Sequence, residues 1–423
     1  MSQDNKKRNA FNALMGKPKK KQALAHSVPV EWKGVGTGKT KAGTTIPSVL
    51  VGNFGGHNSA QKIASFDLDG TLIDVESGKR FAQDEHDWMF KHFAKCSVGD
   101  KFAEWHAKGF KIVIFTNQGG VRAGKLPLDT LKRKLAKIID GLECGFPIQV
   151  FATLGEDEYR KPRIGMWELL NTKDYNDGVE IDTELSFYVG DAAGREKGWQ
   201  KGAKKDHADT DRKFAQNIGI EFYTPEEFFD ERKAVPFILS GLAPHDYFKD
   251  RPQQIVTGDD KLTSDTQEMV LNVGFPASGK TTFYNTHMKP MGYTHVNMDT
   301  IGTAKKCLQV CRESLGAGKS VVIDNTNPTK ATRQDYLAMA KEFGVPCRCF
   351  LFSADKSLAI HCNTFRAVYK KTVDKLPMIA LHTYAKRLEP PTTDEGFSKI
   401  VNINFVPDFS DEKERTAFYS YLT

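Results

Sequence analysis

The sequence has no run of about 18 apolar residues, the length that a membrane-spanning helix needs, so we expect no membrane association. It also has no apolar N-terminal segment of the kind that directs secretion. Its seven cysteines are odd in number and include no pair of C-x-x-C motifs. This usage argues against a disulfide framework, and it favours burial of the Cys307/Cys311 pair over metal binding. Together these absences indicate a reduced, intracellular protein.

The positive charge is concentrated at the N-terminus. The formal net charge is +7, and residues 1–22 hold seven Lys or Arg side chains against one acid. The clusters "KKR" (6–8) and "KPKKK" (17–21) have the spacing of a bipartite nuclear localisation signal, with a solvated basic tail as the alternative. Between them, residues 9–15 place three apolar side chains on one face of a short helix, which we expect to dock onto a repair-protein partner. We therefore predict a disordered basic tail over residues 1–45 and a nuclear location.

Short apolar runs alternate with polar, helix-compatible segments through the rest of the chain. The runs are "KIASFDL", "FKIVIFTN", "IQVFATL" and "LSFYVGD", and then "EMVLNVG", "THVNMD", "SVVIDNTN" and "CRCFLFS". Such runs are typical of buried parallel strands joined by crossover helices. A proline-containing stretch over residues 236–266 separates the two groups. The sequence therefore predicts two α/β domains, over residues 46–235 and 267–423, joined by a connector.

Two aspartates follow the first of these strands. In "FDLDGT", Asp67 and Asp69 are two residues apart and so leave the same side of the strand. Carboxylates this close repel one another unless a cation such as Mg2+ lies between them. Asp67 can then attack a phosphate as nucleophile, and Asp69 can act as general acid and base. Gly70 permits the sharp turn that follows.

Further polar residues follow the next strands in order. Thr116 and Asn117 end "IFTN" and can bind phosphoryl oxygens, while Lys161 of "YRKP" can neutralise charge in a transition state. Asp191 of "VGDAAGR" is a third candidate metal ligand beside Asp67 and Asp69, and Arg195 is assigned to substrate binding. Because parallel strands end at one edge of a sheet, we expect these groups to meet there.

A second site is predicted in the other domain. "GFPASGKT" matches G-x-x-x-x-G-K-[ST] between an apolar strand and a helix-compatible stretch. Backbone N–H groups of such a loop bind phosphates, the lysine reaches the β- and γ-phosphates, and the following hydroxyl binds Mg2+. We assign ATP binding to Gly274, Ala277, Ser278, Gly279, Lys280, Thr281 and Thr282, with Thr281 as the metal ligand.

Residues that would complete a phosphoryl transfer follow later strands. Asp299 and Asp324 are both candidates for the base, and their chemistry alone does not decide between them. Arg333 is a candidate ligand for a substrate phosphate. Arg366 and Lys370 are four residues apart on one face of an expected helix and could close over the ATP phosphates.

The first set of motifs resembles the haloacid dehalogenase superfamily of phosphohydrolases. That superfamily has a second metal-supporting acid, for which Asp206 in "KKDHADTDR" is the candidate. The whole chain from residue 60 resembles the polynucleotide kinase 3′-phosphatase family, and the resemblance rests on "FDLDGTLI", "IFTNQGG", "YRKP", "VGDAAGR", "YTPEEFF", "GFPASGKTT", "IDNTNPT", "GVPCRCFLF" and "EPPTTDEGF".

The resemblance implies a haloacid-dehalogenase-like phosphatase domain followed by a P-loop kinase domain. It implies Asp67 as nucleophile, Asp69 as acid and base, and Asp299 as the kinase base. We assign Asp324 to substrate binding. The resemblance further implies Mg2+, ATP as co-substrate, DNA ends as substrate and a monomeric protein. RNA ends, or a small metabolite in place of a polynucleotide, are the alternatives.

Two features depart from the family. Met298 stands where many relatives have arginine before the base, which removes one phosphate contact. The forkhead-associated domain of animal relatives is not expected in the residues that precede the first strand.

Overall fold

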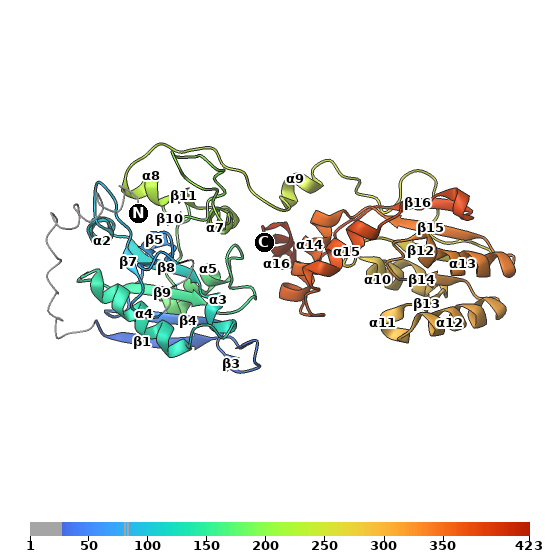
Figure 1. Ribbon diagram of the computed structural model, residues 1–423, viewed down its shortest axis with the longest axis horizontal. Helices are drawn as coiled ribbons and strands as arrows, with labels where there is room; N and C mark the ends of the chain where they lie inside the picture. Colours follow the sequence, from blue (N-terminus) through green and yellow to red (C-terminus); the bar gives the residue numbers. More distant parts are fainter. Residues whose placement is uncertain (1–27, 80–81, 83) are drawn as a thin grey trace, which may run out of the picture.

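Two separate sheets organise two α/β domains, as the sequence predicts (Figure 1). The protein is described here by a computed structural model, which describes residues 28–79, 82 and 84–423. All eight apolar runs predicted as strands contain strands. The basic clusters and the residue 9–15 segment lie outside the described residues. The domain boundaries themselves stay predictions.

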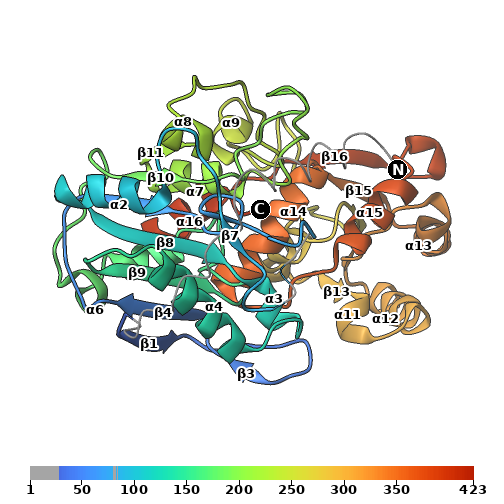
Figure 2. The ribbon, with the colours of Figure 1, turned by 60° about the vertical axis from the view of Figure 1, so that its left-hand side comes forward.

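The N-terminal domain is built on a seven-stranded sheet. The strand order is β1 (Val30–Val35), β4 (Val49–Phe54), β9 (Ile148–Thr153), β8 (Lys111–Asn117), β5 (Ile63–Phe66), β10 (Phe187–Val189) and β11 (Glu221–Tyr223). Figure 2 labels β1, β4, β9, β8, β10 and β11 in this order from bottom to top. The five strands from β9 to β11 are parallel, whereas β4 and β1 are antiparallel additions at one edge.

Part of the predicted disordered tail is therefore folded. Residues 30–35, "VEWKGV", form the edge strand β1, and Val30 and Trp32 pack against the core of the domain. Their alternation of apolar and polar side chains has the period of a half-buried strand, so the prediction of disorder up to residue 45 is wrong. Two small antiparallel sheets accompany the seven-stranded sheet: β2 (Gly38–Lys39) pairs with β3 (Thr45–Ile46), and β6 (Ile73–Asp74) pairs with β7 (Met89–Phe90).

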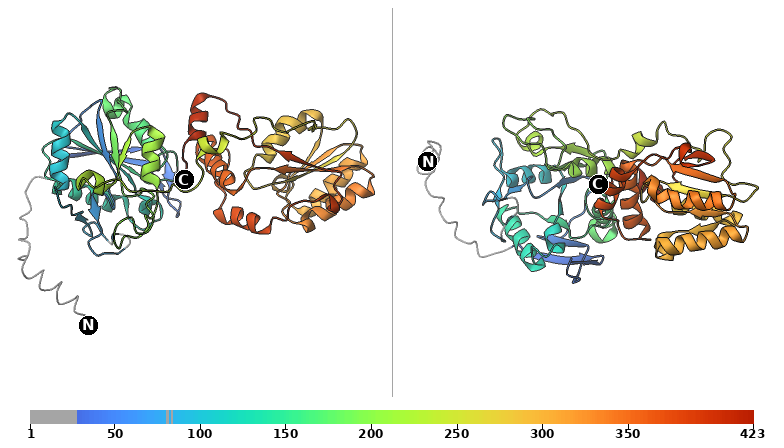
Figure 3. Two further views of the ribbon diagram at one scale, coloured as in Figure 1. Left: turned by 90° about the horizontal axis from the view of Figure 1, so that it is seen from above. Right: turned by 45° about the vertical axis from the view of Figure 1, so that its right-hand side comes forward.

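Helices cover both faces of this sheet, which is seen between them in the left view of Figure 3. One face packs against α2 (Val98–Ala107), α4 (Leu128–Gly141) and α8 (Pro225–Phe229). The other face packs against α5 (Gly165–Leu170), α6 (Lys173–Asn176) and α7 (Thr210–Ile218). A short helix, α3 (Gly119–Arg122), follows β8.

The C-terminal domain contains five parallel strands. Their order is β13 (Thr294–Val296), β14 (Val321–Ile323), β12 (Met269–Val273), β15 (Cys347–Phe352) and β16 (Lys399–Ile403). The helices are α10 (Lys280–Phe283), η1 (Tyr284–Met288), η2 (Lys289–Met291), α11 (Met298–Ile301), α12 (Ala304–Gly316), α13 (Lys330–Glu342), α14 (Lys356–Phe365), η3 (Arg366–Lys370), α15 (Met378–Arg387), η4 (Thr393–Glu395) and α16 (Glu412–Tyr419). Cys307 and Cys311 are free thiols buried in this core, consistent with an apolar role.

The connector and the last residues of the chain lie at the junction of the domains. The connector carries α9 (Pro244–Phe248), and Leu242 and Phe248 are buried in one cluster with Phe418 and Leu422. Figures 1 and 3 place α16 and the C-terminal end beside the N-terminal domain. Among the described residues, no helix is both long enough and apolar enough to cross a membrane.

Candidate active sites

The first site forms where three neighbouring parallel strands end. Asp67 follows β5, Thr116 and Asn117 end β8, and Asp191 follows β10. β5 lies between β8 and β10. From β8 the chain continues outward to β9, and from β10 it continues outward to β11 on the opposite side of β5. Ligands of α/β sheets bind at such a reversal because the flanking loops diverge and leave space above the strand ends.

A buried lysine joins the acids of this site. Lys161 Nζ donates hydrogen bonds to Asp67 Oδ1 (2.6 Å), Asp211 Oδ1 (2.8 Å) and the Tyr188 hydroxyl (2.6 Å). Only 3% of Lys161 is exposed. Burial alone would lower the pKa of Lys161, but Asp211 and Asp67 outweigh burial and raise the pKa. Lys161 is thus a fixed positive charge on the candidate nucleophile.

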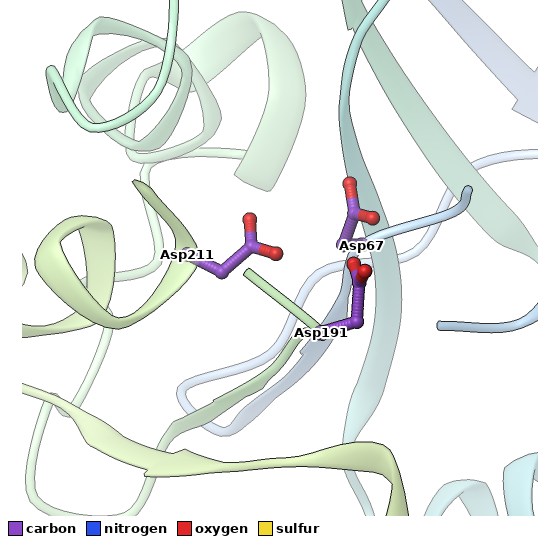
Figure 4. A group of neighbouring side chains, drawn as sticks. All are labelled: Asp67, Asp191 and Asp211. Carbon is purple, nitrogen blue, oxygen red and sulfur yellow. The ribbon is translucent and has the colours of Figure 1, made fainter. Parts of the chain in front are cut away.

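The carboxylates exceed the positive charge that the protein supplies. Oxygens of Asp67, Asp191 and Asp211 all lie within 4.8 Å of one another, and Figure 4 shows the three side chains converging. Burial, with repulsion from Asp211 and Asp191, raises the pKa of Asp67 well above its usual range. Burial and Asp211 raise the pKa of Asp191 to about 6. The site is therefore short of a cation.

One buried oxygen indicates where a cation fits. Asp191 Oδ1 is buried and has no hydrogen-bond partner among the described residues. Asp211, by contrast, is already occupied: its Oδ1 faces Lys161 and Tyr188, and its Oδ2 accepts from the Ala192 N–H (3.0 Å). Asp67 and Asp191 are therefore the residues that would hold Mg2+, whose preference is for carboxylate oxygens. Asp211 is better placed to orient Lys161.

Two glycines allow this crowding. A Cβ at Gly70, whose φ is +85°, would lie 2.5 Å from Asp191 Oδ2. A Cβ at Gly190 would lie 2.5 Å from the Asp211 Cβ. Both glycines are thus required by close approach, and Gly70 also by its turn. In addition, the Thr71 hydroxyl accepts from the Asp191 N–H (3.0 Å) and ties the two loops together.

Asp69 lies apart from the other carboxylates. It is exposed, and it accepts from Gln118 Nε2 (2.6 Å) and Lys134 Nζ (3.2 Å). The same Gln118 group donates to the Thr116 hydroxyl (2.8 Å). An exposed carboxylate two residues from the nucleophile can reach a leaving group. Its side chain does not join the group proposed to hold the metal, in contrast to the sequence prediction.

Several other predicted roles do not fit the contacts found. Asp206 bonds Arg195 instead of approaching the metal group, and Arg195, 3% exposed, also binds Glu226 (2.7 Å). These buried bonds leave Arg195 a structural role rather than substrate binding. The Asn117 side chain forms a reciprocal pair with the main chain of Lys161 (3.1 and 3.2 Å), so it holds the lysine rather than a phosphate.

Sequence reasoning missed two residues of this site. Asp211 lies in "DTDR" at the start of α7, where an aspartate is usually a surface residue of the first helical turn. Arg160 precedes Lys161, and its Nη1 is buried without a partner among the described side chains and near Gly119. Its position directly before Lys161 in the sequence was the signal that could have identified Arg160 as a second cation of the site.

The second site is a loop between β12 and α10. Ala277 and Gly279 have φ values of +63° and +87°, which curl the loop. Lys280 is buried and donates to the main-chain oxygens of Gly274 (3.0 Å) and Phe275 (2.6 Å) and to the Ser278 hydroxyl (3.3 Å). Burial lowers the pKa of Lys280 to about 8, so an anion in the loop would favour its charged form. Thr282, on α10, is exposed.

Asp324, at the end of β14, forms the other side of this site. It accepts from the Thr281 hydroxyl (2.7 Å) and pairs with His295 Nε2 (2.9 Å). Burial alone would raise the pKa of Asp324, but the hydrogen bonds from His295 and Thr281 outweigh burial and lower it. Thr281 and Asp324 therefore fit Mg2+ with hard oxygen ligands.

Asp299 has the properties expected of a base. It lies in α11, is exposed, and its charge acts on both Lys280 and Arg366. Arg366 begins η3, and its Nε is buried without a hydrogen-bond partner in the described part of the chain. The structure thus brings Asp299, Lys280 and Arg366 to one site, while Asp324 is committed to Thr281.

The two remaining basic candidates are engaged elsewhere. Arg333 is fully buried and forms two bonds to Glu395 (2.7 and 2.8 Å), with further bonds to the main-chain oxygens of Asn327 and Glu389. Lys370 pairs with Glu414. Arg333 is therefore held by groups inside the protein, and Lys370 is engaged by Glu414.

Comparisons with known proteins give matches in both domains. Residues 62–229 match the family described as polynucleotide kinase 3 phosphatase, and residues 301–391 match the AAA domain. The chain is 37% identical over 366 residues to the bifunctional polynucleotide phosphatase/kinase of Schizosaccharomyces pombe, across 86% of this chain and 85% of that protein. The chain belongs to the bifunctional polynucleotide phosphatase/kinase family.

Two other relatives match the chain over different shares of its length. A protein of Acanthamoeba polyphaga mimivirus is 37% identical over 386 residues, which is 85% of this chain and 89% of that protein. The polynucleotide 3′-phosphatase of Saccharomyces cerevisiae is 31% identical over 215 residues, which is 40% of this chain and 87% of that protein. The N-terminal domain is thus the phosphatase domain and the C-terminal domain the P-loop kinase domain.

Proposed function

We propose that the protein makes broken DNA strands ligatable, by removing 3′-phosphates and by phosphorylating 5′-hydroxyls with ATP. The proposal rests on one observation: a carboxylate cluster suited to removing phosphate and a P-loop suited to binding ATP occur in one chain. That chain matches a bifunctional relative along most of its length. Opposite reactions at one position would only consume ATP. At opposite ends of a break they produce the 5′-phosphate and 3′-hydroxyl that a ligase joins.

In the phosphatase site, an Asp67 oxygen attacks the 3′-phosphorus and forms an aspartyl-phosphate, and the bond to the sugar oxygen breaks. Asp69 gives a proton to that leaving oxygen and later takes one from the water that hydrolyses the intermediate. Lys161 holds Asp67 at 2.6 Å and offsets negative charge. Bound between Asp67 and Asp191, Mg2+ would reduce the repulsion between nucleophile and phosphate.

In the kinase site, Asp299 takes the proton of the 5′-hydroxyl as its oxygen attacks the γ-phosphorus of ATP, with ADP as the leaving group. Lys280 and the loop N–H groups hold the ATP phosphates, and Arg366 offsets the developing charge. Thr281 and Asp324 would hold the Mg2+ that accompanies ATP. Met298, which is 47% exposed, places an apolar side chain next to Asp299 in the sequence.

The proposal includes a nuclear location, because DNA is the substrate and the N-terminus carries two basic clusters. It also includes a repair-protein partner for residues 9–15 and a monomeric enzyme. Epitope-tagged protein with and without residues 1–22 tests the location. Nuclear exclusion of both forms would contradict it.

The decisive experiment uses a nicked DNA duplex with a 5′-hydroxyl and a 3′-phosphate, incubated with ATP and Mg2+ and scored at both ends. We expect both ends to be converted. The matching RNA strand and a panel of sugar phosphates serve as competing substrates. Turnover of small phosphates with no change at either DNA end would overturn the proposal.

A further inference from the structure

Residues 421–423, which follow α16 of the kinase domain, bind the phosphatase domain through their main chain. The Tyr421 N–H donates to Asn217 Oδ1 (2.8 Å), and the Tyr421 oxygen accepts from Asn217 Nδ2 (2.9 Å). The Leu422 oxygen accepts from Arg163 (2.8 Å) and the Thr423 oxygen from Lys213 (2.7 Å). A short segment of one domain is thus hydrogen-bonded at three points to the other.

These three partners lie on the two elements that carry the catalytic lysine and its aspartate. Arg163 lies two residues after Lys161 on the same loop, and Lys213 lies two residues after Asp211 on α7. Asn217, at the last turn of α7, connects the two elements, because its Nδ2 also donates to the main-chain oxygen of Pro162 (2.8 Å). The 421–423 segment therefore contacts both elements that bring Lys161 and Asp211 together.

The two cations in these contacts have few alternative partners. Arg163 is 4% exposed and, apart from Leu422, donates to the main-chain oxygens of Asp157 (2.7 Å) and Glu156 (3.3 Å). Burial lowers the pKa of Arg163. A buried guanidinium held by carbonyls alone depends on each of them, because an unsatisfied buried donor is costly.

Lys213 is similarly constrained. It is fully buried, forms an ion pair with Asp209 (2.9 Å), and donates to the main-chain oxygens of Ser240 (2.7 Å) and Thr423. Ser240 belongs to the connector, so the start of α7 is held from outside its own domain on two sides. The geometry of the Lys161–Asp211 pair is consequently set in part by residues beyond the phosphatase domain.

We propose that residues 421–423 are a positioning element of the phosphatase site. They fix the Lys161 loop and α7 in register, so that the Lys161 ammonium meets both Asp67 and Asp211. The proposal rests on the phosphatase activity proposed above. It assigns to the kinase domain a part in the phosphatase reaction that is separate from ATP binding, because none of these contacts involves the P-loop.

The test uses the full chain carrying Asn217→Asp. This isosteric change removes both donated bonds and places a carboxylate oxygen against the Pro162 and Tyr421 oxygens. The matched control is Gln216→Glu, the same chemical change at the neighbouring exposed position. A second variant, Leu422→Ala, loosens the segment from its other side, since Leu422 is 1% exposed among kinase-domain side chains.

Phosphatase kcat, KM and the Mg2+ concentration for half-maximal rate are measured with p-nitrophenyl phosphate and with a 3′-phosphate oligonucleotide. We expect Asn217→Asp to lower kcat by about 10- to 100-fold, the range for a misplaced catalytic group. KM, the Mg2+ requirement and the kinase rate should stay within about two-fold, because the substitution changes no residue that we assign to substrate, Mg2+ or ATP binding. Leu422→Ala should lower phosphatase kcat in the same selective way, and Gln216→Glu should resemble the wild type.

Wild-type kcat in Asn217→Asp would overturn the positioning role. So would a parallel loss of phosphatase, kinase and thermal stability, which indicates general unfolding. If Asn217→Asp does not fold, Leu422→Ala decides by the same measurements. A wild-type enzyme inactive on both phosphatase substrates would instead refute the proposed function itself.

Discussion

Replacing Lys161 by methionine should destabilise the phosphatase domain by about 3–5 kcal/mol in the absence of metal. The side chain is almost completely buried and makes three hydrogen bonds, two of them to carboxylates. Its removal leaves Asp67 and Asp211 buried without their cation, and breaking a buried ion pair from one side costs this much. Asp211→Asn should cost less, because Lys161 then keeps Asp67.

The double variant Lys161→Met/Asp211→Asn removes one charge of each sign. We expect it to be more stable than the sum of the single effects predicts, by about 2 kcal/mol or more. Added Mg2+ should recover part of the loss in Lys161→Met, because a cation again separates the carboxylates. All three variants should lack normal phosphatase activity and keep the kinase rate.

Urea unfolding, carried out once in EDTA and once with Mg2+ in place of EDTA, measures these differences by tryptophan fluorescence. The signal reports the phosphatase domain alone, because the chain's five tryptophans all precede the connector: Trp32, Trp88, Trp105, Trp167 and Trp199. Strict additivity of the two single effects would refute the electrostatic account of the site. A stable, metal-independent Lys161→Met would refute it as well.

Three further predictions concern substitutions of individual residues. Asp67→Asn should abolish 3′-phosphatase activity and spare the kinase, and Lys280→Ala should do the converse; loss of both activities in one folded variant would contradict two independent sites. Burial lowers the pKa of His361 to about 4 from its ordinary 6.5. Protonation of His361 therefore favours the unfolded chain, so the stability of the kinase domain is full above pH 6.5 and decreases as the pH falls towards 4. Between pH 7 and 5 the kinase domain should lose about 2 kcal/mol of stability by circular dichroism, and His361→Gln should remove most of that slope. Met298→Arg should lower the kinase KM for a 5′-hydroxyl oligonucleotide with little change in kcat, because an added cation binds phosphate before and during the reaction alike; an unchanged KM would count against this.

The sequence was most informative where chemistry imposes fixed spacing. Asp67, Asp69 and the P-loop were identified because a strand end followed by a tight turn needs particular residues at particular positions. The strand pattern then predicted which of them would meet, since buried parallel strands end at one edge. Lys161 and Asp191 were found this way although they lie far apart in sequence.

The sequence could not predict which charged side chains are buried, nor which partner each of them binds. Arg195 and Arg333 look like phosphate ligands in the linear sequence, and only their carboxylate partners Glu226 and Glu395 show that they are structural. Asp211 was not identified because its contact with Lys161 spans 50 positions. β1 was missed because a single alternating edge strand resembles a polar tail when its partner strand is unknown.

The link between Arg163 and Leu422 crosses 259 positions, and this has a consequence for biosynthesis. The phosphatase domain leaves the ribosome before the kinase domain, yet Arg163 and Lys213 find main-chain oxygen partners at residues 422 and 423, which follow α16. The first domain to be translated is therefore the last to be completed. A polypeptide released before that point would carry every residue of its first active centre and still lack the support that aligns it.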